Sequence, residues 1–283
     1  MKQYILFFIV IAGVIFSLNK ISHSVFPNEY QIHFFHITEG DAILIKTPSG
    51  KNILIDTGKN QITLNKIQKY NSMFQNTIDI LFITHGDSDH IGGTASIANK
   101  MNIKSIVYSG ANKPSRTFKN MEMQTKETPK NILFSNATWR IDQNILLETI
   151  APLSNISYHD EHTNNDSLVF RLTFFNKKSI LFTGDIEAET EKAILISGQD
   201  ISADMLKVAH HGSKSSSIKT FIQNVSPKLA IIQAGKNNKF KHPHKETLKI
   251  FESFNIPTKI TATSGDILFC ISKKHPDFHI CPQ

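Results

Sequence analysis

Short apolar runs alternate with polar turns along most of the chain, a pattern typical of proteins built from many short strands. Two pairs of runs, within residues 42–55 and 167–183, are joined by polar turns and predict β-hairpins. Apolar residues at helical spacing predict helices between the strands. The expected strands are 31–37, 41–47, 51–56, 78–83, 104–108, 132–134, 144–150, 167–175, 179–183, 205–209, 229–233, 259–263 and 266–272, and the expected helices are 62–70, 95–100, 187–196, 217–225 and 245–254.

These elements form a mostly β first half and a mostly β second half, each with helices. Polar clusters rich in His and Asp occur only where predicted strands end. We therefore expect an α+β fold in which two β-sheets pack face to face with helices outside, and one site along their common edge. The polar stretch 110–130 is expected to form a loop or a short helix over that site.

The most informative stretch is residues 81–93, where an apolar strand leads directly into a polar turn. His85, Asp87, Asp89 and His90 fall within six positions of this turn. Two imidazoles and two carboxylates so close together are costly to bury without a cation, whereas a divalent metal ion gives all four a partner. The strand–turn–helix context favours a metal site over the alternative, a solvated polar loop.

Other predicted strands also deliver polar side chains at their ends. Asp56 ends one strand and is expected to support the metal turn from behind; the alternative is a carboxylate that caps its own turn. Asp185 follows a second strand, and the pair His210 and His211 follows a third.

The composition is that of an ordinary globular protein, with 283 residues of which 40% are hydrophobic and 19% charged. A net charge of +7 favours an anionic partner such as nucleic acid or an anionic membrane surface, against the alternative of a merely solubilising lysine surface. The stretch from Lys207 to Lys249, both included, has nine lysines and one acid, and Ser213 and Lys214 offer contacts to a phosphate backbone. Aromatic residues for base stacking are sparse there, only Phe221 and Phe240, so no base specificity is expected.

The N-terminus carries an apolar stretch at residues 4–18, flanked by Lys2 and Lys20. Its length is typical of a secretory signal peptide, which we place at residues 1–24; an uncleaved membrane anchor is the alternative. Residues 25–283 then form the functional domain in an exported protein, periplasmic or extracellular. Cys270 and Cys281 either pair in that setting or remain as buried thiols.

Seven motifs in the same order resemble the metallo-β-lactamase-fold hydrolases, and among them the C-terminal extracytoplasmic domain of the ComEC competence proteins. The matching stretches are residues 39–42, 53–58, 85–93, 165–169, 181–185, 206–213 and 235–244. The resemblance implies an αββα sandwich in a single domain, with two divalent metal ions at the sheet edge. It spans residues 30–271, nearly all of the chain after the N-terminal segment.

The resemblance also implies roles for individual residues. His85 and Asp87 would hold the first metal ion, Asp89 and His90 the second, and Asp185 would bridge them. His211, rather than its neighbour His210, and either His242 or His244 would complete the site; Asp41 joins Asp56 as support behind the ligands.

The chain departs from the family pattern at two places. Glu39 stands where relatives commonly have Gln, and no secure match exists for the His that many members supply before the bridging Asp. His159 and His162 lie in that gap but do not fit the family pattern there.

The expected function is that of an exported, metal-dependent phosphodiesterase that degrades DNA. Two ions, Zn²⁺ or Mn²⁺, would activate water, with Asp89 and His211 as catalytic candidates and Ser213, Lys214, His242 and His244 as substrate contacts. One alternative is a hydrolase of a small phosphoester such as phosphocholine, or of a lactone or lactam. Another is a surface protein that binds metal and DNA without turnover. A transient membrane association through the N-terminus is expected, and no protein partner is inferred.

Overall fold

The computed structural model describes residues 28–71, 75–111, 113–153 and 164–281. The predicted signal peptide or anchor at residues 1–24, and the boundary after it, lie outside the described residues. Within the described ranges, no helix has both the length and the apolar character needed to cross a membrane.

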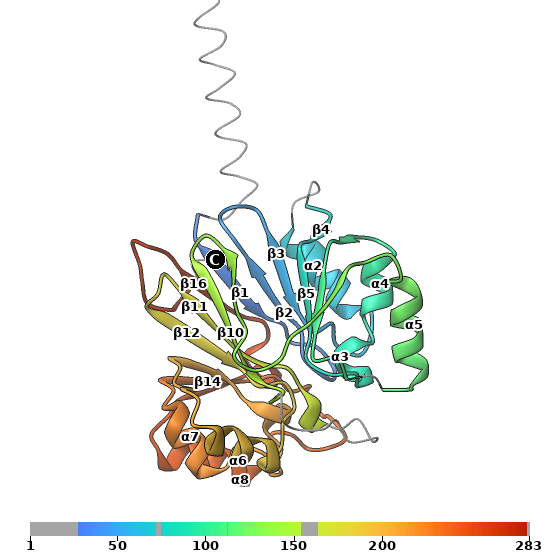
Figure 1. Ribbon diagram of the computed structural model, residues 1–283. Helices are drawn as coiled ribbons and strands as arrows, with labels where there is room; N and C mark the ends of the chain where they lie inside the picture. Colours follow the sequence, from blue (N-terminus) through green and yellow to red (C-terminus); the bar gives the residue numbers. More distant parts are fainter. Residues whose placement is uncertain (1–27, 72–74, 112, 154–163, 282–283) are drawn as a thin grey trace, which may run out of the picture.

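Two mixed β-sheets form the centre of the molecule (Figure 1). The first has eight described strands in the order β17 (His279–Ile280), β16 (Ile267–Ile271), β1 (Tyr30–Phe34), β2 (Ile43–Lys46), β3 (Asn52–Ile55), β5 (Ile80–Ile83), β7 (Ile106–Tyr108) and β8 (Lys130–Ile132). The second has seven in the order β15 (Thr258–Ile260), β14 (Leu229–Ile232), β13 (Met205–Lys207), β12 (Lys178–Phe182), β11 (Val169–Phe174), β10 (Ile145–Ala151) and β9 (Thr138–Asp142). A further pair consists of β4 (Thr77–Ile78) and β6 (Asn102–Ile103).

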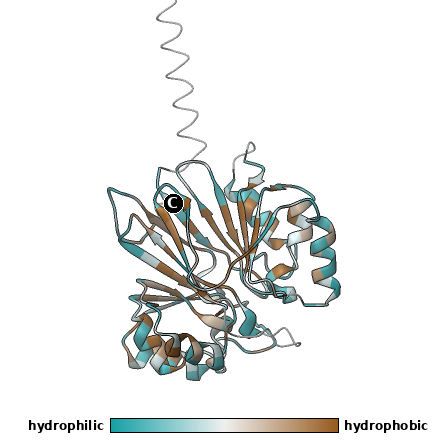
Figure 2. Cartoon of the chain, in the orientation of Figure 1, coloured by the Kyte–Doolittle hydropathy of each residue, from teal (hydrophilic) through white to brown (hydrophobic). Residues whose placement is uncertain are grey.

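Helices cover the outer face of each sheet. The first sheet is covered by α2 (Ile62–Tyr70), α3 (Ser88–Ile91), α4 (Thr94–Ala98) and α5 (Arg116–Gln124), and the second by α6 (Ala188–Ser197), α7 (Lys219–Val225) and α8 (Lys245–Ser253). Their amphipathic faces pack apolar side chains onto the strands, as the hydropathy colouring shows (Figure 2). The predicted αββα sandwich in a single domain is thereby confirmed.

The inner core lies between the sheets. Phe82 of β5 stacks on Phe170 of β11 with ring centroids 4.9 Å apart, and Phe170 stacks on Phe182 of β12 at 5.1 Å. All three rings are at most 1% exposed. Because β5 and β12 end next to this stack, it fixes the spacing of the two loops that carry the polar motifs.

Several expected elements differ from the structure. The strand expected at residues 259–263 ends at Ile260, and the short helix α9 (Thr261–Ser264) follows. The Thr261 hydroxyl hydrogen-bonds the backbone N–H and carbonyl of Ala234, and this contact holds the chain in the turn that ends the strand. The polar motif turn contains the short helix α3. The edge strands β9 and β17 were not predicted, since exposed edge strands lack the apolar alternation that marks a buried one.

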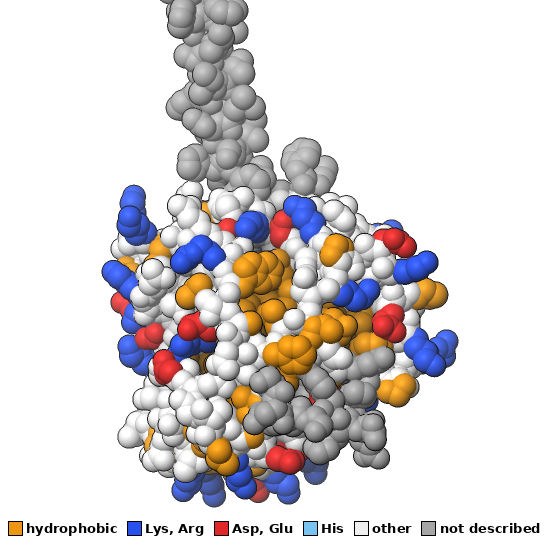
Figure 3. Space-filling view, in the orientation of Figure 1, with side chains coloured by type: hydrophobic (Ala, Val, Ile, Leu, Met, Phe, Trp, Pro, Cys, Tyr) orange, Lys and Arg blue, Asp and Glu red, His pale blue; other side chains and the backbone are white. Residues whose placement is uncertain are grey.

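Apolar side chains also gather on the face seen in Figure 3. Among the described residues, three exposed apolar side chains belong to the edge strands β8 and β9 or to the segment between them: Ile132 (48%), Phe134 (42%) and Trp139 (39%).

Cys270 and Cys281 form a disulfide that joins the end of β16 to the residue after β17. Closing an 11-residue separation is expected to stabilise the fold by about 3 kcal/mol, because it restricts the unfolded chain.

The double variant Cys270→Ser/Cys281→Ser should lose this amount of unfolding free energy, measured by urea unfolding. A reductant should destabilise the wild type equally and leave the double variant unchanged; an effect of reductant on the double variant would contradict the assignment.

His33 of β1 is buried beside Tyr70, with ring centroids 4.5 Å apart. Burial, assisted by the charge of Lys46, lowers the pKa of His33 to about 3. The folded chain therefore keeps His33 neutral while the unfolded chain takes up a proton below pH 6.5. Its contribution to stability is full above pH 6.5 and falls by about 1.4 kcal/mol per pH unit as the pH drops toward 3.

His33→Phe should remove this dependence. Between pH 6.5 and 4.5 we expect the variant to lose about 2–3 kcal/mol less unfolding free energy than the wild type. Urea unfolding at the two pH values measures the difference, and parallel losses would show that His33 titrates normally.

Candidate metal centre

The polar motifs meet where strands of both sheets end. Parallel strands β3 and β5 deliver Asp56 and His85 from the first sheet, and parallel strands β12 and β13 deliver Asp185 and His211 from the second. Because carboxyl ends of parallel strands share one sheet edge, four segments far apart in sequence converge. The site expected along the common edge is found there.

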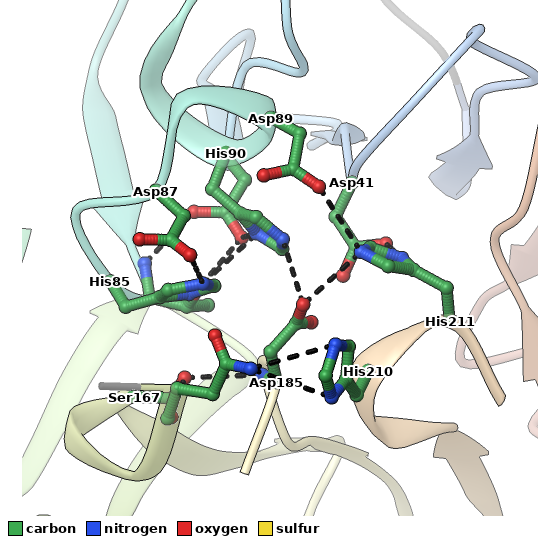
Figure 4. Close-up of polar contacts among 12 residues, drawn as sticks. Asp41, His85, Asp87, Asp89, His90, Ser167, Asp185, His210 and His211 are labelled. Atoms are coloured by element: carbon green, nitrogen blue, oxygen red, sulfur yellow. Dashed lines mark hydrogen bonds and ion pairs between the residues drawn. The ribbon is translucent and has the colours of Figure 1, made fainter. Parts of the chain in front are cut away.

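Asp185 occupies the centre of the cluster (Figure 4). Its Oδ2 lies 3.1 Å from Nε2 of His211 and 3.3 Å from Nε2 of His90. Asp89 Oδ2 lies 3.6 Å from the same Nε2 of His211. Donor atoms held tetrahedrally by one ion at about 2.1 Å lie about 3.4 Å from one another, so this spacing suits a shared cation.

His85 and Asp87 lie on the other side of His90. Nε2 of His85 is 3.9 Å from Oδ2 of Asp87, and the His85 and His90 rings have centroids 4.1 Å apart. The second oxygen of Asp87 contacts the ammonium of Lys113. The stretch expected to lie over the site thus touches it through Lys113, just before helix α5.

Three buried imidazoles share one arrangement. Each of His85, His90 and His211 engages Nδ1 with a neighbouring oxygen: Thr84 Oγ1 at 3.0 Å, Asp56 Oδ2 at 2.8 Å and the Gln233 carbonyl at 3.1 Å, respectively. Each Nε2 is buried and makes no hydrogen bond of good geometry among the described residues, although the Nε2 atoms of His90 and His211 lie within 3.3 Å of Asp185 Oδ2 as ion pairs; Asp185 Oδ1 likewise makes no hydrogen bond there. Buried polar atoms left unpartnered in this way are costly, and a divalent cation gives them a common partner. The residues therefore fit a metal ion, and imidazole with carboxylate suits Zn²⁺ or Mn²⁺.

Asp56 holds the first motif from behind. It is fully buried and accepts hydrogen bonds from the Thr84 backbone N–H (2.8 Å), the Thr84 hydroxyl (2.7 Å) and His90 Nδ1–H (2.8 Å). These bonds orient His90 with Nε2 toward Asp185. The carboxylate lies where the sequence predicted its support.

Asp41 holds His211 in the same manner. One oxygen is 3.3 Å from His211 Nδ1, and the other contacts the ammonium of Lys207, which is 1% exposed. Asp41, His90, Asp185 and His211 form one group whose potential ligand atoms lie within 4.8 Å of one another. Because Asp41 contacts the Nδ1 side of His211, it supports this ligand from behind. Gly40 makes the placement possible, since a Cβ there would lie 1.6 Å from the Asp89 carbonyl oxygen.

Electrostatics couple these groups strongly. Burial lowers the pKa of His90 and of His211, but the charge of Asp185 reverses the effect, and both pKa values are raised well above the usual one. Burial raises the pKa of Asp185, yet the two imidazoles outweigh it and hold this pKa well below its ordinary range. For His85, burial and the charge of His90 lower the pKa to about 4. The centre therefore keeps a negative charge on Asp185, between the candidate ligands His90 and His211.

His211, not His210, faces the cluster. Both residues have left-handed backbone angles, with φ of 49° for His210 and 53° for His211, which is costly for residues other than Gly and is often found at functional sites. This turn sends the two imidazoles apart. His210 Nδ1 lies 3.2 Å from Glu187, and Asn164 approaches the same ring at 3.5 Å.

The four predicted substrate contacts have different environments. Ser213 is 6% exposed, and its hydroxyl contacts Ser215, so it is not presented to a ligand. Lys214 is exposed, and its backbone N–H donates to Nδ1 of His244 (3.0 Å). His242 lies beside His211, with ring centroids 6.1 Å apart, and lines a hollow that also contains Asp89.

Sequence reasoning missed some residues and misplaced others. Lys207, one of the nine lysines expected to be available to an anion, is instead buried against Asp41; its position in an apolar strand is the signal in the sequence that indicates burial. Phe221 is 1% exposed and cannot stack on a ligand. Glu39 contacts Lys59. His159 and His162 lie outside the described residues.

Comparison with known proteins agrees with this geometry. The family model described as the metallo-beta-lactamase superfamily matches residues 38–236, more than half of the chain. ComE operon protein 3 of Bacillus subtilis (strain 168) is 28% identical in an alignment 280 residues long that covers 90% of this chain and 35% of that protein. Recombination protein 2 of Haemophilus influenzae is 29% identical over 243 residues, covering 84% of this chain and 28% of that protein. The chain thus spans about a third of the length of these relatives.

A solved structure shows the same fold. The metallo-beta-lactamase fold protein YhfI from Bacillus subtilis aligns with a TM-score of 0.57 and 11% identity, over 86% of this chain and all of that one. At this identity the likeness concerns the fold alone. With its sandwich, its ordered motifs and its convergent His and Asp side chains, this chain belongs to the metallo-β-lactamase superfamily and resembles the competence proteins of the ComEC type.

Proposed function

We propose that the protein is an exported phosphodiesterase that hydrolyses DNA with two divalent metal ions, Zn²⁺ or Mn²⁺. The observation that carries the proposal is the set of three buried imidazoles whose Nε2 atoms lack a hydrogen-bond partner in the described structure, next to the carboxylate of Asp185. A site for structural support alone would give these atoms hydrogen bonds of good geometry within the protein. Imidazole nitrogens that gather around one carboxylate without such bonds instead favour a working metal centre.

The residues divide into two candidate sets. His85 and Asp87 would hold one ion, Asp89, His90 and His211 would hold the other, and Asp185 lies between the sets. Such a metal pair lowers the pKa of bound water and neutralises charge on a phosphodiester. The protein residues behind the ligands orient them: Asp56 sets His90, and Asp41 with Lys207 sets His211.

Positive charge beside the hollow favours a polyanion as substrate. Lys236, Lys239 and Lys241 are exposed and alternate with residues that line the hollow next to Asp89 and His211. Ammonium groups there position a phosphate backbone without reading its sequence. His242 lines the same hollow and offers an imidazole to a phosphate oxygen.

The names of the relatives add support for DNA. One name refers to the ComE operon and another to recombination, and the chain matches only about a third of each protein. DNA as substrate is therefore an inference from a part of these relatives, to be tested directly.

Export is proposed on two features. Residues 4–18 are apolar enough for a signal peptide or anchor, through which a transient membrane association would arise. The disulfide between Cys270 and Cys281 suits an oxidising compartment such as the periplasm or the extracellular space.

The test is cleavage by the purified full-length chain in mild detergent. Single- and double-stranded DNA, and a small phosphoester such as phosphocholine, would be incubated with Mn²⁺, Zn²⁺ or EDTA, beside an Asp185→Asn variant. Metal-dependent DNA cleavage absent from the variant supports the proposal. Two bound ions with no DNA cleavage would contradict it, and hydrolysis of the small ester would then identify the substrate class. Absence of bound metal would contradict a hydrolase altogether.

A further inference from the structure

A hollow lies between the metal-donor cluster and the segment before helix α8. Asp89 and His211 form its inner wall, and Phe240 and His242 belong to its outer wall. A ligand at the mouth of this hollow would therefore lie next to both the candidate metal centre and the two aromatic side chains.

The outer wall exposes more than half of an aromatic side chain to solvent. Phe240 is 55% exposed, although burying such a side chain is normally favourable. Its ring lies nearly parallel to that of His242, with an interplanar angle of 22° and centroids 5.7 Å apart. The two rings are stacked on each other and form one aromatic unit at the hollow, with the ammonium of Lys239 over the Phe240 ring.

The segment that carries these rings is held firmly. The Asn238 side chain donates to the carbonyl oxygens of Gly235 (2.9 Å) and His242 (2.7 Å), and accepts from the His242 backbone N–H (2.8 Å). At its start, Gly235 packs so tightly that a Cβ there would lie 1.8 Å from the Thr38 carbonyl oxygen. The rings are thus mounted on a braced loop, as a preorganised binding surface requires.

The positive charge around these rings indicates which class of ligand would bind to them. Lys239 Nζ lies 4.6 Å from the Phe240 ring centroid, and Lys236 and Lys241 are exposed nearby. A quaternary ammonium such as choline would be repelled here, although aromatic rings otherwise attract it. A ligand that joins a neutral aromatic ring to a phosphate could stack on the aromatic side chains and place its phosphate near the lysines.

We propose that Phe240 and His242 form a stacking wall for an unpaired nucleobase next to the phosphodiester at the metal centre. This inference rests on the proposed function and names its substrate class: single-stranded nucleic acid, read without regard to base identity. Every base offers a π-face to such a wall, whereas a paired and stacked base in a duplex has none free.

The test compares Phe240→Leu, which keeps apolar volume but removes the aromatic face, with Phe240→Tyr, which retains the face. With a single-stranded oligonucleotide we expect Phe240→Leu to raise KM by about 5- to 100-fold with little change in kcat, and Phe240→Tyr to resemble the wild type. Phe134 is an exposed ring between β8 and β9 that does not line the hollow, so Phe134→Leu is the matched control and should have no effect. An oligonucleotide in which abasic residues replace the bases should be cleaved equally by all four proteins.

Binding separates failure of the wall from failure of the enzyme. Fluorescence anisotropy with a labelled single strand, in EDTA, measures affinity without cleavage. Weaker binding by Phe240→Leu alone, and weaker wild-type binding to duplex, support the wall even if DNA is never cleaved. Equal affinity of wild type and Phe240→Leu for the single strand would overturn it, whether or not cleavage is seen.

Discussion

Asp185→Asn is expected to abolish stoichiometric metal binding and reduce hydrolysis by at least about 10³-fold, while the fold remains intact. The amide is isosteric with the carboxylate but carries no charge, and Asp185 is the residue that lies within 3.3 Å of both His90 and His211. Removing a residue behind a ligand typically costs about 10- to 100-fold in metal affinity, and loss of a central ligand should exceed this. Elemental analysis of the purified protein measures bound metal, and circular dichroism verifies the fold.

Asp277→Asn is the matched control. Asp277 is an exposed carboxylate paired with Lys178 at the opposite end of β12, so its change should leave metal content and activity at wild-type levels. If Asp185→Asn retains two ions, Asp185 is not a ligand, and the division of the ligands around it is wrong.

Lys207→Met is expected to destabilise the protein by about 3–5 kcal/mol, because it leaves the carboxylate of Asp41 buried without its cation. Asp41 also contacts His211, so the variant should bind metal more weakly as well as unfold at lower urea concentration. Urea unfolding in EDTA measures the first effect, and metal titration of the folded variant measures the second.

Two further variants test whether the effect comes from the ion pair between Asp41 and Lys207. Lys207→Met/Asp41→Asn has no unpaired buried charge and should recover part of the lost stability, which shows coupling of the two residues. Lys192→Met changes an exposed lysine of helix α6 and should have little effect. Equal losses for Lys207→Met and Lys192→Met would contradict the buried ion pair.

Local patterns along the sequence predicted most of the elements. Helix α2 has the bounds expected from its apolar spacing, and both hairpins form with the predicted pairing, because turn residues and side-chain periodicity act over a few neighbouring positions. The deviations occur where long-range contacts override local preference, as at Thr261, whose hydroxyl bonds Ala234. Edge strands such as β9 have one unpaired side and so carry no strong pattern.

The sequence by itself determined which residue types could form a metal centre, because His and Asp were concentrated at strand ends in recognisable motifs. Only the tertiary structure decided how they are used. His210 and His211 are adjacent and chemically identical, and a left-handed turn at the end of β13 directs just one of them toward Asp185. Lys207 resembles a surface lysine in composition, yet packing buries it against Asp41. The physical reason is that burial and the distance between residues remote in sequence depend on how the two sheets pack, whereas strand ends and turns are set locally.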